Sequence, residues 1–195
     1  MFPDLARLLE EVRACTHCQR VLPHGARPVL QAGAGARLRL ISQAPGRKVH
    51  ETGIPWNDAS GDRLREWLGI DRQRFHDATR VAIIPMGFCY PGRATSGDHA
   101  PRPECAPLWH DRLNAQLPDI TLTLLIGHHA QARYLGRTRK PTMTQTVRAW
   151  AEYLPRGFMP LPHPSPRNQP WQARNPWFDE EVLPALREAV RATLS

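Results

Sequence analysis

The stretch Leu38–Gly61, LRLISQAPGRKVHETGIPWNDASG, is expected to decide both the fold and the function. It opens with an apolar run over residues 38–41, which predicts a buried strand. Ser42–Gly46 stops that strand, because its proline and glycine break regular structure and expose backbone N–H groups. A polar loop with Pro55–Asp58 in its middle follows, and a helix is predicted over Asp62–Leu68. α/β proteins place their ligand sites in such strand–loop–helix units, beyond the carboxyl ends of the strands.

Further apolar segments along the chain alternate between strand and helix patterns. Three are almost continuously apolar and predict buried strands: Arg80–Ile84, Thr121–Ile126 and Phe158–Leu161. Helices are predicted over five other segments: Asp4–Ala14, Cys105–Leu117, His129–Leu135, Thr144–Tyr153 and Pro176–Leu194.

This alternation indicates a parallel sheet with helices on both faces. We therefore expect an α/β fold: a three-layer α/β/α sandwich with a short central, mainly parallel four-stranded sheet, in a single domain over residues 1–195. Parallel strands end at the same edge of a sheet. The turns after the first and fourth strands, Ser42–Gly46 and Pro162–Pro166, should therefore share one cleft.

The composition favours a polyanionic partner. The 195 residues carry 26 Lys and Arg against 18 Asp and Glu, which gives a formal net charge of +8. Only Lys48 and Lys140 are lysines, and arginine can bind a phosphate through two parallel hydrogen bonds. Charge alone is equally compatible with an ordinary basic protein. No segment approaches the roughly 20 apolar residues of a membrane helix, and the N-terminus lacks a signal-peptide pattern, so we expect a cytoplasmic protein without membrane contact. The sequence gives no hint of oligomers, and a monomer is the default expectation.

The four cysteines suggest a bound metal centre. Cys15 and Cys18 form a C-x-x-C pair, whereas Cys89 and Cys105 stand at the two ends of a long loop. A zinc ribbon would usually show a second close pair. Four thiolates from separated segments suit a [4Fe–4S] cluster better, which would pin the N-terminal helix to the loop Tyr90–Pro103. The alternative is four unrelated buried cysteines.

Four motifs resemble those of a known family. Ser42–Gly46, SQAPG, looks like a G-[EL]-A-P-G loop, and Thr52–Trp56, TGIPW, looks like T-G-R-P-F. Asp58–Gly61, DASG, matches the end of G-D-A-S-G, and His163–Asn168 is H-P-S-P-R-N. With the cysteine pattern, these motifs resemble the uracil-DNA glycosylase superfamily from Cys15 to Asn168. The similarity is nearest to its iron–sulfur branches, families four and five.

The sequence departs from the family pattern at several places. Ser42 and Asn57 stand where the motifs have glycine. Ala44 occupies the position of the water-activating aspartate of the classical enzyme. The asparagine with which many members read uracil would fall near Pro85, although family five also lacks it.

The resemblance implies a monofunctional DNA glycosylase of base-excision repair. It would act on DNA that contains uracil or a related deaminated base such as hypoxanthine, and the base must leave the helix to enter a pocket. Bond cleavage builds positive charge on the sugar and negative charge on the departing base. We expect Asp58 to stabilise the first charge and to hold the attacking water, and His163 to donate a hydrogen bond to the second.

The other candidate residues fall into two sets. Substrate binding is assigned to Gln43, Ala44, Pro45, Gly46, Trp56 and Asn57. DNA contacts are assigned to Ser165, Arg167, Asn168 and Trp171. Trp56 is expected to stack on the base, whereas Trp67 and Trp150 are expected in the core. Asp58 could instead cap a helix, but we expect Ser60 to do so.

Two further readings stay open. One is a DNA-binding member of the same fold that has lost its chemistry. The other is an iron–sulfur redox protein unrelated to DNA.

Overall fold

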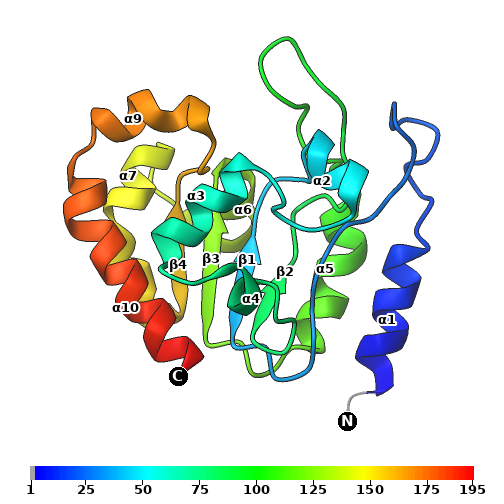
Figure 1. Cartoon of the computed structure of the whole chain (residues 1–195), viewed down its shortest axis with the longest axis horizontal. Coiled ribbons are helices and arrows are strands. Elements are labelled where there is room, and N and C mark those ends of the chain that lie inside the picture. The colour runs from blue at the N-terminus through cyan, green and yellow to red at the C-terminus, as the bar shows by residue number, and fades with distance from the viewer. Residues whose placement is uncertain (1–2) are drawn as a thin grey trace.

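The structure, a computed structural model, describes residues 3–195 and is built around one parallel sheet (Figure 1). Its strands are β1 (Leu38–Ile41), β2 (Val81–Ile83), β3 (Leu122–Ile126) and β4 (Phe158–Leu161). They lie in the order β2-β1-β3-β4, and every neighbouring pair is parallel. The predicted α/β sandwich is therefore confirmed, and its sheet is wholly rather than mainly parallel.

The strands are buried on both faces, which explains their continuous apolar runs. All five residues of β3 are buried, and successive side chains point to opposite faces. Leu122 and Leu124 join the core on one side of the sheet, whereas Leu125 joins the core on the other. Each face of the sheet therefore demands its own helical layer.

One layer packs against the face of Leu122. It contains α3 (Ala59–Leu68), α4 (Arg72–Phe75), α7 (Met143–Arg148), α9 (Gln169–Ala173) and α10 (Leu183–Leu194). Trp67 is 3% exposed within this core, as expected, and its ring centroid lies 4.9 Å from that of Phe178. Trp150 is only half-buried and packs at the border of the same core.

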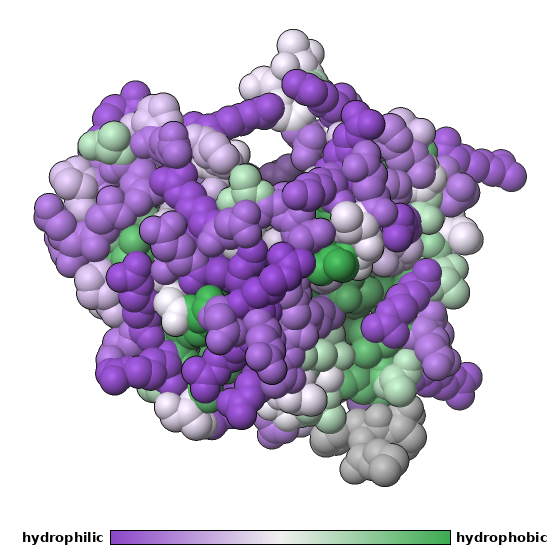
Figure 2. All heavy atoms as spheres, in the orientation of Figure 1, coloured by the Kyte–Doolittle hydropathy of each residue, from purple (hydrophilic) through white to green (hydrophobic). Residues whose placement is uncertain are grey.

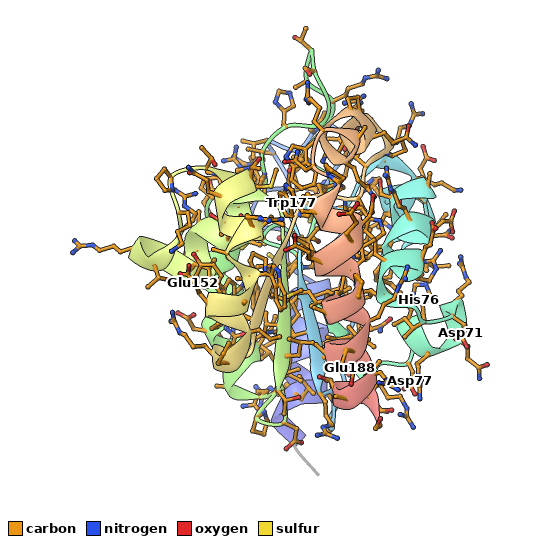
Figure 3. All side chains as sticks on the ribbon, turned by 90° about the vertical axis from the view of Figure 1, so that its left-hand side faces the viewer. Asp71, His76, Asp77, Glu152, Trp177 and Glu188 are labelled. Carbon is orange, nitrogen blue, oxygen red and sulfur yellow. The ribbon has the colours of Figure 1, made fainter. Side chains whose placement is uncertain are left out.

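The second layer covers the face of Leu125. It contains α1 (Pro3–Arg13), α5 (Cys105–Ala115), α6 (His128–Leu135) and α8 (Trp150–Tyr153). Figure 3 looks at the sheet from its side, with Glu152 of α8 on one side of the strands and His76, beside α4, on the other. Of the helices in the described part of the chain, none is long and apolar enough to cross a membrane.

Several helices differ from those predicted. The polar loop after β1 contains a short helix, α2 (Arg47–Thr52), which ends where Gly53 adopts a positive φ of 71°. The helix predicted over Thr144–Tyr153 is divided at Ala149 into α7 and α8. The closing helix begins with a π-helical turn, Phe178–Val182, before α10. The apolar residues spaced three to four positions apart along this segment are nevertheless all buried: Phe178, Val182, Leu186, Val190 and Leu194.

His110 of α5 is a fully buried histidine that links the sheet to α6. Its Nε2 lies 3.0 Å from the carbonyl oxygen of Pro85, and its Nδ1 lies 2.9 Å from the hydroxyl of Tyr134. Because a carbonyl can only accept, Nε2 carries the proton and Nδ1 accepts from Tyr134. Burial lowers the pKa of His110 to about 4, although the hydrogen bond to Pro85 opposes this.

Stability should therefore fall as the pH drops from 6.5 to about 4. The unfolded chain binds a proton at His110 below pH 6.5, while the folded chain excludes it, so protonation favours unfolding. The free energy of unfolding should decrease by about 3 kcal/mol over this range. Urea unfolding at pH 7.5 and pH 4.5 measures it, with His110→Gln as the reference because glutamine can still donate to Pro85. An equal loss in both proteins would contradict the assignment.

Candidate functional site

A cavity of about 430 Å³ opens at the carboxyl ends of the strands. It is lined by Ser42–Gly46, which follows β1, and by His163, which follows β4. The prediction that these two turns share one cleft is therefore correct. A loop between β2 and α5 rises above this edge of the sheet (Figure 1), and the space-filling view shows an opening beneath it (Figure 2). Ser96, Gly97 and Asp98 of this loop complete the wall.

Trp56 forms one wall of the cavity from a strained turn. Its φ is 55°, a left-handed conformation that costs a bulky residue on the order of 1–3 kcal/mol. Its carbonyl oxygen accepts a hydrogen bond from Nη1 of Arg65 at 3.3 Å. The ring centroid lies 5.6 Å from that of His163, at an interplanar angle of 31°. Trp56 is only 8% exposed, so it belongs to the core and lines the cavity at the same time.

Asp58 caps α3 and also lines the cavity. Its Oδ1 accepts a hydrogen bond from the backbone N–H of Gly61 at 2.8 Å. The expectation that Ser60 caps this helix is therefore wrong: α3 begins at Ala59, which places Ser60 inside its first turn. A carboxylate has two oxygens, so the cap leaves Oδ2 of Asp58 free to face the cavity.

His163 is held as a neutral hydrogen-bond donor. Its Nδ1 accepts from the backbone N–H of Ser165 at 3.2 Å, which leaves the proton on Nε2. Burial lowers the pKa of His163, and the nearby carboxylates of Asp58 and Asp98 oppose this only in part. Asn168 steadies the same turn by donating from Nδ2 to the carbonyl oxygen of His163 at 2.7 Å.

The structure places two predicted site residues away from the cavity. The side chain of Asn57 accepts a hydrogen bond from Nη2 of Arg72 at 2.8 Å, which engages the amide outside the cavity wall. Trp171 donates from Nε1 to Oγ1 of Thr144 at 2.8 Å, and its ring packs against that of Phe178. Asn168 also lies outside the cavity lining and acts on the turn of His163. The other residues predicted for catalysis, substrate binding or DNA contact line the cavity: Gln43, Ala44, Pro45, Gly46, Trp56, Asp58, His163, Ser165 and Arg167.

Asp98 is a cavity residue that the sequence analysis missed. It comes from a loop without periodicity, so no pattern marked it. The only signal was indirect: Cys89 and Cys105 bracket the loop, and a shared metal centre would bring its ends together. The residue pair Arg93 and Asp98 forms an isolated antiparallel bridge that folds the tip into a narrow hairpin.

The four cysteines line one small cavity, even though they come from distant parts of the sequence. All four thiols are free, and its walls include Leu22, Phe88 and Trp109. Burial raises the pKa of Cys89 to about 11 and that of Cys105 to about 12. Across residues 3–195, no group of three candidate ligands is arranged to hold a single metal ion.

Comparison with known families agrees with this geometry. Residues 31–187 match the family model described as the Uracil DNA glycosylase superfamily. The matched segment contains the whole sheet, the turn of Trp56 and Asp58, and the turn of His163. It begins after Cys15 and Cys18, so the first cysteine pair lies outside it. The chain belongs to the uracil-DNA glycosylase superfamily.

Proposed function

We propose that this chain is a monofunctional DNA glycosylase that hydrolyses the N-glycosidic bond of uracil, or of a related deaminated base such as hypoxanthine, in DNA. One observation carries the proposal: an aromatic ring, a carboxylate and a neutral histidine line a single cavity of about 430 Å³. They are Trp56, Asp58 and His163. Family membership supports DNA as the substrate.

The base would enter the cavity after leaving the helix. Trp56 offers it an apolar face, and stacking on an aromatic ring contributes about 1–3 kcal/mol per base. Burial of Trp56 against the core fixes the direction of its ring, so little ordering remains for the moment of binding.

Bond cleavage would proceed with opposite charges at the two ends of the breaking bond. The electron pair of the C1′–N bond leaves with the base, and the sugar becomes positive. Asp58, held at the start of α3, stabilises the sugar. The Nε2–H of His163 donates to a carbonyl oxygen of the leaving base, and such a donor typically lowers the activation barrier by about 2.7–4 kcal/mol. Water then bonds to C1′, which leaves an abasic site and a free base.

The surrounding surface would hold the phosphates. The formal net charge of +8 is spread almost wholly over arginines, and Arg167 stands at the cavity itself. Neutralising phosphates releases counterions, so binding should weaken as salt rises.

An excision assay tests the proposal. Labelled DNA with uracil or hypoxanthine, single- and double-stranded, is incubated with the protein and cleaved by alkali. Asp58→Asn should keep the helix cap but excise about a hundredfold more slowly, because the charge is lost. His163→Phe should reduce the excision rate by about 10²–10³-fold, because phenylalanine cannot donate the hydrogen bond. Asp119→Asn, in the turn between α5 and β3 at the opposite edge of the sheet, is the matched control.

A second candidate is a DNA-binding member without chemistry. Ala44 favours it, because this cavity residue lacks the water-activating carboxylate that the classical enzyme of the superfamily has at this position. The absence of abasic product from every substrate, together with salt-dependent binding that Asp58→Asn leaves unchanged, would establish this candidate instead.

We also propose that Cys15, Cys18, Cys89 and Cys105 hold a [4Fe–4S] cluster. The donor set fits: four thiols face one apolar-walled cavity, and the backbone N–H of Phe88 lies 3.4 Å from Sγ of Cys105, as suits a cluster sulfur ligand. Such a cluster would supply a covalent tie rather than a catalytic group. These residues join the end of α1, the loop above the cavity and the start of α5.

Metal analysis of protein purified without oxygen tests this proposal. We expect about four iron and four sulfide per chain, with a broad visible absorbance band. Cys89→Ser should lose most of the iron and unfold at a lower temperature. One zinc per chain, or four free thiols by titration of the anaerobic protein, would contradict the cluster.

A further inference from the structure

Two carboxylates, rather than one, face each other across the cavity. A methyl group placed on the Cα of Gly46 would lie 3.7 Å from Oδ2 of Asp58 and also 3.7 Å from Oδ2 of Asp98. These two oxygens therefore flank the same small volume. Both residues line the cavity, and both carboxylates act electrostatically on His163.

The volume between the two oxygens stays open because Gly46 has no side chain. The backbone of Gly46 has a φ of −79° and a ψ of 175°, which any residue adopts. A methyl group there would make only ordinary van der Waals contacts with the protein. Neither the conformation nor the packing of the folded chain therefore requires glycine at this position. A water molecule in this volume would have both carboxylates as hydrogen-bond acceptors.

Asp98 is held in place by its hairpin. The hydroxyl of Tyr90 donates to Oδ1 of Asp98 at 3.5 Å, which leaves Oδ2 toward Gly46. The next residue is anchored to the opposite wall, since Nε2 of Gln43 donates to the carbonyl oxygen of His99 at 3.2 Å. The hairpin is thus tied to the first strand-end turn, although it is exposed to solvent.

An exposed carboxylate on a face that binds DNA repels phosphate, so its presence at the cavity calls for a chemical role. We propose that Asp98 is a second catalytic carboxylate, which with Asp58 holds the attacking water above Gly46 and accepts its proton. This inference rests on the proposed glycosylase function and assigns to the hairpin a task that Ala44 cannot perform.

The oxygen of the water bonds to C1′, and the C1′–N bond breaks with its electron pair going to the base. One proton of the water passes to Asp98, whose exposure lets it return the proton to solvent. The base leaves as an anion, accepts the hydrogen bond of His163, and takes up a proton from solvent. Asp58, with one oxygen committed to Gly61, keeps its charge beside the sugar throughout.

Single-turnover excision by the full-length protein tests the role, with Asp98→Asn, Asp98→Ala and Gly46→Ala as variants and Asp119→Asn as the charge-matched control. Asp98→Asn should excise about 10²-fold more slowly or worse. Its affinity for an undamaged duplex should be equal or higher, because a negative charge is removed. Gly46→Ala should fold normally, but its excision rate should fall about tenfold or more, because its methyl group fills the place of the water. Added formate should restore part of the rate of Asp98→Ala.

Two results would overturn the inference while leaving the function intact. One is an active wild-type protein with Asp98→Asn within about twofold of it. The other is a reduced excision rate in Asp98→Ala that formate does not restore, together with full activity in Gly46→Ala. That combination would give Asp98 a purely structural role. A wild-type protein that excises no base would overturn the inference and the proposed function together.

Discussion

The close approach of Gly61 to the carbonyl group of Trp56 is the constraint on which the cavity depends. A methyl group on Gly61 would lie 1.8 Å from that oxygen, so only glycine allows α3 to start where it does. The contact lets Trp56 keep its left-handed turn, and it brings the N–H of Gly61 to the carboxylate of Asp58. One backbone contact thus fixes both the aromatic wall and the carboxylate. The strain of the turn is offset by the cap and by the hydrogen bond from Arg65.

The sheet turns this local geometry into a site. Because β1 and β4 run parallel on either side of β3, their carboxyl ends deliver two rigid turns to the same edge. The turn after β4 is fixed by its own hydrogen bonds, from the N–H of Ser165 to His163 and from Asn168 to the carbonyl of His163. The ring centroids of His163 and Trp56 therefore lie 5.6 Å apart, and each ring is positioned by contacts within its own turn. Preorganisation of this kind needs no ligand to assemble it.

What the sequence could predict follows from the range of the interactions involved. Buried parallel strands leave continuous apolar runs, so the four strands and the shared edge were predictable. The sequence does not distinguish Asp58 from Ser60 as the helix cap, because the true start of α3 depends on the contact of Gly61 with a residue five positions earlier. Asp98 was not predictable, since its place is set by Tyr90 and by the distant Gln43 through a non-periodic loop.

The distribution of charge suits the proposed function, in which a strongly basic protein would bind DNA and still stabilise a cation. The net charge of +8 attracts phosphates over the surface, but the cavity contains two carboxylates and a histidine that burial keeps neutral. Protonation of His163 would remove this contrast and would also place a second N–H against that of Ser165. A neutral donor at the base and negative charge at the sugar match the polarity of the breaking bond. In the proposed reaction the basic exterior and the acidic cavity would therefore act together, because the first would bind the polyanion and the second would favour the charge that develops on its sugar.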